Sequence, residues 1–372
     1  MARRRSKRKA SFGRRRQRRR SGPSPRLVLA GLCGLGGVGW FVGLPGSVGE
    51  GTPPALSTGA VAADEGTETA PPAGVRPAED PGARPARPVP AELARALESE
   101  AGDADGLLDL RRLAVEFPGT PEAARARALL ERVRTAGLAE ADAEQGGAGG
   151  HLHRLRGLTR AYLATVDPRA RRGLRERALA ASREAFAPRN PPAALFKTVT
   201  VAPGDVLARI ARREGSDYRL IMRLSGLRSD RIRVGQRLLV PRVPVSVIVF
   251  KGDFELVLLL GGHFLRAYDV ATGKDGRTPE GIFEIGKGKL VNPDWYSPDG
   301  KLYKFGTKEN ILGTRWLPFV NTPEHQGFGI HGTSFPESIG TEASMGCLRL
   351  RNPDVEELYD LVPPGSRVRI VR

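Results

Sequence analysis

A histidine and a cysteine lie sixteen residues apart near the C-terminus, in a segment that also contains several glycines. The segment reads GIHGTSFPESIGTEASMGCLRL, and its two reactive side chains are His331 and Cys347. A cysteine attacks carbonyl carbon as its thiolate, and a histidine within hydrogen-bond reach both accepts the thiol proton and supplies a charge that favours the thiolate. The pair therefore suggests acyl transfer through a thioester, provided that the fold brings the two residues together.

The neighbours of the cysteine fit the same chemistry. Gly346 lets the backbone bend, so that the amide N–H groups of Met345, Gly346 and Cys347 can face a developing oxyanion. Arg349 follows the cysteine by two residues and lies on the same side of the chain if this segment is extended. These residues predict a compact site built around one turn.

Other interpretations of these residues are available. A lone cysteine is often a small buried hydrophobic residue. His325, in the loop sequence NTPEHQGFG, is an alternative base, although such a loop position is more often simply solvated. His263 falls in a predicted hairpin turn and is a less suitable base. The spacing alone leaves the acyl-transfer hypothesis and these alternatives open.

The N-terminus predicts a membrane anchor. The first 20 residues contain 12 Lys or Arg and no acid, and residues 27–44 carry no charge. About 18 helical residues span roughly 27 Å, close to the hydrocarbon thickness of a thin bilayer. The positive-inside rule then predicts a cytoplasmic segment at 1–26, a single membrane-spanning anchor at 27–49 and an exported remainder, which places the catalytic residues in the periplasm or at the cell wall.

This topology separates the two cysteines of the chain. Cys33 lies within the predicted anchor, so a disulfide with Cys347 is not expected. A cleaved signal peptide is the alternative to an anchor, with residues 60–62 as a small-x-small site, although that site lies further than usual from the apolar run. The net charge of +18 is concentrated in the N-terminal basic block, so no nucleic-acid partner is expected.

The sequence between the anchor and residue 190 divides into two parts. Residues 50–90 are rich in Pro, Ala, Gly and acids with few large apolar residues, which predicts a disordered linker. Residues 91–190 have apolar residues at three- and four-residue steps, which predicts an all-α region. Its FPGTPEAARARALLERV phrase resembles the helix junction of degenerate tetratricopeptide-like repeats. We interpret this region as a spacer or docking module whose protein partner is unknown.

Residues 197–242 predict a small βααβ module that resembles the LysM family. The phrases GDVL, IAR and IRVGQRLLVP stand at the family's positions, while Val206 and Ser225 replace its usual Thr or Ser and Asn. The resemblance implies binding of N-acetylglucosamine-containing glycan, here peptidoglycan. It assigns the glycan contacts to Gly204, Asp205, Gly235 and Gln236. A spacer that does not bind glycan is the alternative.

Residues 243–372 predict a mainly-β domain. Alternation around residues 252–253 and 261–262 predicts three antiparallel strands joined by tight turns. A helix over NPDVEELYDLV and a closing strand over SRVRIVR follow the histidine and cysteine. The whole chain is therefore expected to be multidomain, with a membrane helix, a linker, a helical region, the LysM module and this catalytic domain.

The C-terminal domain resembles the YkuD-type L,D-transpeptidases. The resemblance rests on H-G-T, S-I-G and S-x-G-C-hydrophobic-R, and extends upstream through TGKDGRTPEGIFEI, NPDWYSP and LGTRWLPF. It implies that Cys347 is the nucleophile, His331 the base and the Gly332 carbonyl the group that orients the imidazole. It also implies backbone oxyanion donors at 345–347 and substrate contacts at Ser344, Arg349, Thr333 and Trp316. Many members have His where this chain has Met345.

The resemblance implies a peptidoglycan crosslinking enzyme that needs no metal and no cofactor. The cysteine would attack the third residue of a tetrapeptide stem, release D-alanine and pass the acyl group to an amine, which gives a 3→3 crosslink or attaches a protein to the wall. Water in place of the amine would make the protein an L,D-carboxypeptidase or endopeptidase. A non-catalytic peptidoglycan-binding scaffold is the alternative from a different class.

Overall fold

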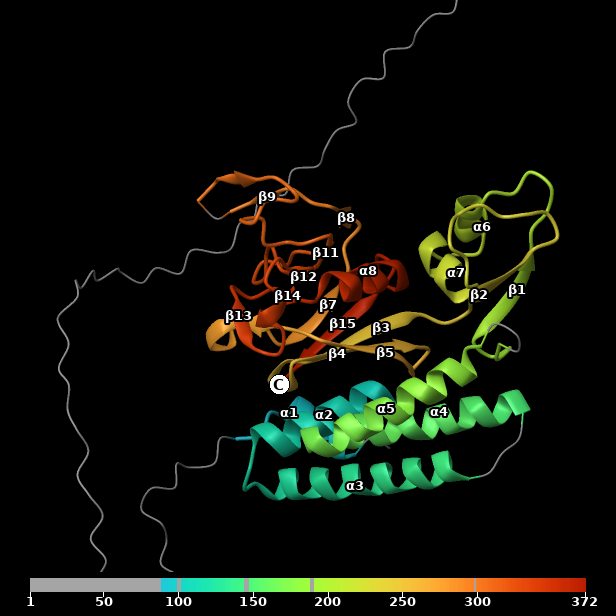
Figure 1. Cartoon of the computed structure of the whole chain (residues 1–372). Helices are drawn as coiled ribbons and strands as arrows, with labels where there is room; N and C mark the ends of the chain where they lie inside the picture. Colours follow the sequence, from blue (N-terminus) through green and yellow to red (C-terminus); the bar gives the residue numbers. More distant parts are fainter. Residues whose placement is uncertain (1–87, 99–101, 144–146, 188–190, 298) are drawn as a thin grey trace, which may run out of the picture.

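The computed structural model describes residues 88–98, 102–143, 147–187, 191–297 and 299–372, which form a helical bundle, a βααβ module and a mainly-β module (Figure 1). The predicted anchor at 27–49 lies outside the described residues, as does the predicted linker except for its last three residues. Within the described ranges, no helix has the length and apolar character needed to cross a membrane.

The predicted all-α region is confirmed as a bundle of helices. Its elements are α1 (Ala91–Ala94), η1 (Arg95–Leu97), α2 (Ala104–Glu116), α3 (Pro121–Asp142), α4 (Gly147–Ala164) and α5 (Pro168–Ala185). The side chains of Asp103, Thr120 and Asp167 accept backbone N–H groups at the starts of α2, α3 and α5. Pro121 and Pro168 occupy the first helical turn, where the missing N–H costs nothing.

The predicted βααβ order is also confirmed. The module consists of β1 (Phe196–Thr200), α6 (Leu207–Arg213), α7 (Tyr218–Leu224) and β2 (Arg237–Pro241), and its two strands pair antiparallel. Its small core is formed by buried apolar residues of both helices and both strands, among them Leu207, Ile210, Ile221, Leu238 and Val240.

The C-terminal module contains two main sheets. The larger has the order β5-β4-β3-β15-β7, formed by β3 (Val245–Phe250), β4 (Glu255–Leu260), β5 (His263–Asp269), β7 (Gly281–Glu284) and β15 (Arg367–Val371). The predicted meander β3-β4-β5 is confirmed, and the closing strand β15 inserts parallel to β3. The smaller sheet has the order β14-β12-β11-β8, formed by β8 (Leu290–Val291), β11 (Arg315–Pro318), β12 (Gly329–His331) and β14 (Leu348–Arg349).

Short elements complete this module. They are η2 (Lys251–Asp253), β6 (Thr272–Gly273), η3 (Lys274–Gly276), β9 (Trp295–Tyr296), β10 (Leu302–Tyr303), η4 (Pro336–Ser338), β13 (Glu342–Ser344) and α8 (Asn352–Leu361). Strands β9 and β10 pair antiparallel, and β13 pairs parallel with β6. The pairing of β13 with β6 brings the chain just before the cysteine alongside the chain that follows β5.

The helical bundle packs against the larger sheet (Figure 1). Tyr162 of α4 contacts Phe264 and Phe250 edge to face, with ring centroids 5.1 and 6.2 Å apart. The contact is also charged, because Arg171 of α5 pairs with Asp253 and, through Nε at 3.3 Å, with Glu255. The bundle is therefore docked on the larger sheet of the C-terminal module.

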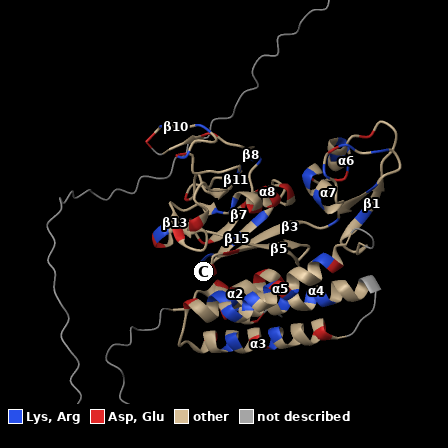
Figure 2. Cartoon of the chain, viewed as in Figure 1, with Lys and Arg blue, Asp and Glu red and all other residues tan. Residues whose placement is uncertain are grey.

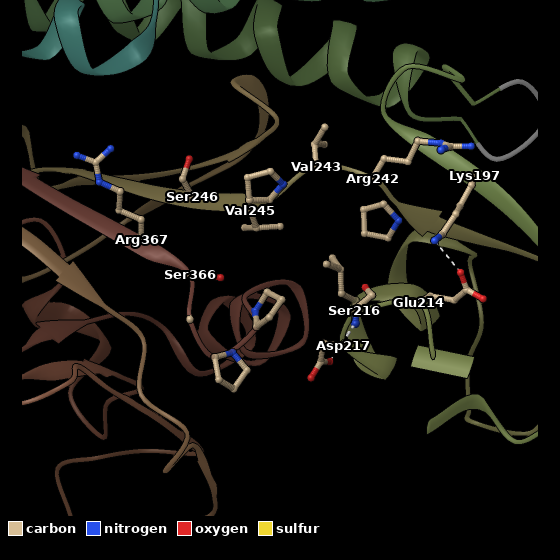
Figure 3. Close-up of a pocket in the computed structure, with 17 residues that line it drawn as sticks. Lys197, Glu214, Ser216, Asp217, Arg242, Val243, Val245, Ser246, Ser366 and Arg367 are labelled. Atoms are coloured by element: carbon tan, nitrogen blue, oxygen red, sulfur yellow. Dashed lines mark hydrogen bonds and ion pairs between the residues drawn. The ribbon is translucent and has the colours of Figure 1, made fainter. Parts of the chain in front are cut away.

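The LysM-like module also contacts the catalytic module directly. Asp360 of α8 pairs with Arg219 Nη1 at 3.3 Å and with Arg223 Nη2 at 2.9 Å, both from α7. Beside this contact, a cleft of about 940 Å³ opens between the two modules, and the Lys197–Glu214 ion pair lies in its wall (Figure 3). Its lining contains neither cysteine nor histidine, so this cleft is not where acyl transfer would occur.

Candidate active site

Two parallel strands bring the predicted catalytic residues to one place. Strand β12 pairs with β14 so that His331 is opposite Arg349, and the Leu350 N–H donates to the His331 carbonyl at 2.9 Å. Cys347 directly precedes β14 and is two residues from Arg349, so the thiol is at the start of the strand that pairs with the one carrying His331. The charge of Arg349 acts on both groups, which agrees with this arrangement.

His331 is held as a neutral base. Its side chain is only 2% exposed, and Nδ1 donates to the Gly332 carbonyl at 2.6 Å. Because a carbonyl oxygen only accepts, the proton is on Nδ1 and the lone pair is on Nε2. Burial, and then the positive charge of Arg349, lower the pKa of His331 to about 3. The imidazole is therefore ready to accept a proton at neutral pH.

Ser344 fixes the turn that carries the cysteine. Its hydroxyl donates to the Cys347 carbonyl at 2.6 Å and accepts the Gly346 N–H at 3.0 Å. The expected oxyanion donor at Gly346 is therefore engaged by Ser344, in contrast to the sequence-based expectation. The Cys347 Sγ lies 3.8 Å from the Gly327 carbonyl, and Met345 points outward with 46% exposure.

Gly346 has to be glycine for two reasons. Its φ is +137°, a backbone conformation that residues with a side chain rarely adopt. A Cβ at this position would also lie 2.6 Å from Cε1 of Phe328 and 3.1 Å from the Arg277 carbonyl. The turn is thus closely packed against Phe328 and Arg277.

Thr278 braces the same turn, although the sequence-based predictions did not single it out. Its side chain is buried, and its hydroxyl donates to the Gly346 carbonyl at 2.9 Å while accepting the Gly273 N–H at 2.7 Å. Gly273 permits this approach, because a Cβ there would lie 2.8 Å from the Gly346 Cα. The TGKDGRTP phrase, which entered the sequence analysis only through the family resemblance, therefore lies directly against the turn that carries Cys347.

Asn352, at the start of α8, was also missed from the sequence. Its Oδ1 accepts the backbone N–H groups of Thr314 at 3.2 Å and Thr333 at 3.1 Å. It thereby joins the segment that follows His331 to the segment that precedes β11. The Asn-Pro pair at a helix start is a weak signal for capping, but nothing local in the sequence identifies its two distant partners.

Three of the four predicted substrate contacts are internal instead, and Ser344, which is 3% exposed, is the one already described. Trp316 lies opposite His331 on β11, is 2% exposed, and has its ring centroid 5.8 Å from that of the imidazole. Thr333 is 2% exposed, and its hydroxyl accepts the Phe335 N–H at 3.0 Å. Both side chains therefore support the histidine and its loop. Arg349 is only half-buried and remains available to a substrate, although its backbone is bonded on both sides to Ala271.

The alternative histidines lie elsewhere. His325 packs edge to face against Phe283 and Phe328, with centroids 5.4 and 6.0 Å away. His263 begins β5 on the larger sheet, where its Nδ1 bonds to the Gly261 carbonyl at 2.9 Å. Neither is on β12, the strand that pairs with the one following Cys347, whereas His331 is.

The residues assigned to glycan binding lie on two neighbouring loops of the LysM-like module. Gly204 and Asp205 are between β1 and α6, and Gly235 and Gln236 precede β2. Hydrogen bonds of 2.9 Å from the Val201 N–H to the Gln236 carbonyl and from the Gly235 N–H to the Val201 carbonyl join the loops. The Asp205 carboxylate accepts the Ala202 N–H at 3.0 Å, which is a turn-forming contact.

The geometry defines a class: a mainly-β domain that carries a buried neutral imidazole on one strand and a thiol immediately before the parallel strand beside it. Comparison with known proteins agrees, because the family model of the YkuD L,D-transpeptidase catalytic domain matches residues 244–370 and that of the LysM domain matches residues 199–241. The chain belongs to the YkuD family of L,D-transpeptidases and carries a LysM domain before its catalytic domain.

Two relatives from Bacillus subtilis illustrate the likeness. Putative L,D-transpeptidase YqjB is 40% identical over 126 residues, which are 33% of this chain and 69% of that protein. Putative L,D-transpeptidase YkuD is 32% identical over 186 residues, which are 47% of this chain and 99% of that protein. The NMR structure of the E. faecium L,D-transpeptidase catalytic domain aligns with 34% of this chain and 96% of that one, at 23% identity and a TM-score of 0.28.

Proposed function

We propose that the protein is a peptidoglycan L,D-transpeptidase that works through a thioester on Cys347. The observation that carries the proposal is the β12-β14 pairing, in which the neutral His331 is opposite Arg349, two residues after Cys347. A thiol, a proton acceptor and a cation at one site are the groups that thiol-based acyl transfer requires. No metal and no cofactor takes part in the proposed reaction.

The acylation step follows from these positions. The Cys347 sulfur bonds to the carbonyl carbon of the third stem residue while the thiol proton moves to Nε2 of His331. The carbon–nitrogen bond to D-alanine then breaks, and the imidazolium returns the proton to the leaving amine. Because the pKa of His331 is lowered to about 3, a resting thiolate–imidazolium pair is disfavoured, so the proton is transferred as the carbon–sulfur bond forms.

Deacylation repeats the sequence with an acceptor amine. The amine attacks the thioester, the carbon–sulfur bond breaks, and the proton lost by the amine reprotonates the sulfur through His331. We assign the oxyanion to the backbone amides of the 345–347 turn; the Gly346 N–H would have to leave the Ser344 hydroxyl to join them. Arg349 would hold a carboxylate of the stem, since its side chain is half-buried beside the thiol.

We propose that the LysM domain holds the glycan while the catalytic domain reacts with the stems. Binding one part of a polymer raises the effective concentration of the rest at the second site. The basic block and apolar run of residues 1–49 support an anchor in the cytoplasmic membrane, with both domains outside it at the wall.

Turnover of a soluble tetrapeptide stem, with and without an acceptor stem, tests the function by mass spectrometry. We expect a crosslinked product from the wild type and none from Cys347→Ala or His331→Ala, with unchanged circular dichroism. His263→Ala is the matched control and should retain turnover, because His263 begins β5 on the larger sheet and bonds to the Gly261 carbonyl. Crosslinking by Cys347→Ala would reject the mechanism, and loss of D-alanine without crosslinking would identify a carboxypeptidase.

A further inference from the structure

The LysM domain carries a large excess of positive charge. Residues 197–242 contain eleven Lys or Arg and four Asp or Glu. Three of the four acids have local partners: Asp205 and Glu214 pair with Arg213, Glu214 also pairs with Lys197, and Asp217 caps α7. The domain therefore has several guanidinium groups for which it provides no counter-charge.

These guanidinium groups are concentrated between α7 and β2. Arg228, Arg231, Arg233 and Arg237 are all exposed, and among the described residues none of them has a carboxylate within 4.0 Å. The single acid of this segment, Asp230, is also exposed and forms no ion pair there. Arg219 and Arg223 differ from this group, because both are used to dock the domain on Asp360. Figure 2 shows basic positions along α6, α7 and the adjoining chain.

Part of this segment forms a hollow. Arg231, Arg233, Val234 and Gln236 line a surface depression of about 530 Å³. Val234 is 66% exposed, which gives the depression an apolar patch next to two cations. The backbone is fixed by a turn in which the Arg233 N–H donates to Gln236 Oε1 at 2.9 Å and the Gln236 N–H donates to the Arg233 carbonyl at 3.0 Å. The two guanidinium groups are therefore presented from an ordered turn.

We propose that this hollow binds the anionic groups of a cell-wall polymer, in addition to the neutral glycan that a LysM domain binds. The proposal rests on the proposed function, because the polymer is the one on which the catalytic domain acts or one attached to it. A guanidinium forms paired hydrogen bonds with carboxylate or phosphate oxygens, and two such groups favour a ligand with repeated negative charges. A neutral N-acetylglucosamine oligomer offers hydroxyl and acetamide oxygens as acceptors but no negative charge to pair with them.

Binding to four ligands by the full chain tests this inference. The ligands are an N-acetylglucosamine oligomer, uncrosslinked peptidoglycan strands with free stem carboxylates, the same strands with those carboxylates amidated, and poly(glycerol phosphate). Arg231→Gln with Arg233→Gln should weaken binding of the anionic ligands about tenfold, as expected for two charged contacts of modest strength, and leave the neutral oligomer unaffected. Wild-type binding of the anionic ligands should also weaken as salt is raised.

Arg212→Gln with Arg209→Gln is the matched control, since both residues are exposed basic positions of the same domain on α6, outside the hollow. Equal losses of binding in the two double variants would show a general charge effect and would overturn the proposed site. Equal binding of native and amidated strands, together with no binding of poly(glycerol phosphate), would also overturn it. Preference for native over amidated strands identifies stem carboxylates as the ligand. Binding of poly(glycerol phosphate) alone identifies phosphodiesters.

The binding experiment can fail without the proposed enzymatic activity failing, and the reverse is also true. Turnover of a soluble tetrapeptide stem depends on the site around Cys347 and not on the hollow. The Arg231→Gln, Arg233→Gln protein should therefore turn it over at the wild-type rate. Cys347→Ala should conversely retain wild-type binding of the anionic ligands. Loss of binding with normal turnover supports the hollow, and loss of turnover with normal binding concerns only the catalytic mechanism.

Discussion

His331 is neutral in the folded protein for two physical reasons that act in the same direction. Burial removes the water that would stabilise an imidazolium, and the positive charge of Arg349 on the adjacent strand opposes a second one. The hydrogen bond to the Gly332 carbonyl favours the charged form but is the smaller influence. The same contact fixes the tautomer, so one short bond determines which nitrogen can accept the thiol proton.

The lowered pKa predicts a pH dependence of stability. The unfolded chain has a histidine pKa near 6.5, whereas the pKa of His331 in the fold is about 3, so the unfolded state binds more protons between these values. The stability associated with this group is complete above about pH 6.5 and is lost as the pH falls toward 3. The expected loss is about 2 kcal/mol between pH 7.5 and 5.

Urea unfolding of the wild type and of His331→Gln at pH 7.5 and 5.0 measures this effect. The glutamine cannot titrate, so its free energy of unfolding should fall by about 2 kcal/mol less than that of the wild type over this interval. All other ionisable groups are shared and cancel in the comparison. The same fall in both proteins would mean that the folded histidine has an ordinary pKa.

A second prediction at this scale concerns Gly346. Gly346→Ala places a side chain at φ +137° and 2.6 Å from a carbon of Phe328, so the turn that holds Cys347 must shift. We expect a loss of about 1 to 3 kcal/mol in the free energy of unfolding and at least a tenfold loss in kcat/KM, because small displacements of reacting atoms are costly. Gly340→Ala is the control: its φ is +87° but its Cβ would meet nothing within 4 Å. Similar activity loss in both variants would attribute the effect to backbone strain alone.

At the scale of elements, the site is an assembly of segments that α8 connects. The N-terminal residue of this helix, Asn352, holds the loops after His331 and before β11, and Asp360 near its other end accepts two arginines of the LysM domain. Lys289 bonds to the carbonyls of Tyr359 and Val362 at the C-terminal end, where a cation is favoured by the helix dipole. One helix thus fixes both the histidine loop and the neighbouring domain.

Asn352→Ala tests the catalytic half of this role. The substitution leaves the amides of Thr314 and Thr333 without their acceptor, at an expected cost of at least about 2 kcal/mol in the free energy of unfolding. Because the Thr333 loop contains the Gly332 carbonyl that orients the imidazole, kcat should fall several-fold while KM stays near its wild-type value. Asn352→Asp keeps an acceptor oxygen and should restore most of both quantities. Failure of Asp to restore kcat would separate Asn352 from the orientation of His331.

The sequence could predict the parts of the site that depend on local pattern. His331, Cys347 and the glycine before the cysteine form one short segment, and the strand alternation that puts Arg349 beside Cys347 is also local. Asn352 and Thr278 could not be identified in this way, because their partners are 19 to 68 residues away and only the folded topology brings them together. Trp316 was assigned to substrate through the family resemblance, and its burial against His331 is likewise a tertiary property.

At the scale of the whole molecule, the helical bundle covers one face of the larger sheet of the catalytic module. The face of the larger sheet that it covers is apolar, and the bundle and sheet share one core that includes Phe250, Val257 and Phe264. The sequence showed that these helices are amphipathic but not which surface they cover. The position of Arg171 is the clearest case: it is 1% exposed, pairs with Asp253 of η2 and Glu255 of β4, and lies 4.2 Å from the Phe250 ring centroid.

This interface predicts that bundle and catalytic module unfold as one unit. Arg171→Ala leaves Asp253 and Glu255 with one fewer partner at a buried interface, and breaking such a pair costs about 3 to 5 kcal/mol. In a chain that begins at residue 88, the ellipticity at 222 nm reports mainly the helices, and the two tryptophans, Trp295 and Trp316, report the catalytic module. Both signals should therefore move to lower temperature together in Arg171→Ala, since a shared core makes the transition cooperative.

Arg177→Ala provides the comparison on the same helix. Arg177 pairs with Asp142 at 2.6 Å, but the two side chains are 40% and 64% exposed, so its loss should cost less than about 1 kcal/mol and barely move either signal. A bundle that acted only as a spacer would give a different result: Arg171→Ala would lower the helical transition and leave the tryptophan transition in place. Coincident shifts require that the helices stabilise the larger sheet. The smaller sheet and the thiol lie on the other side of that sheet (Figure 1).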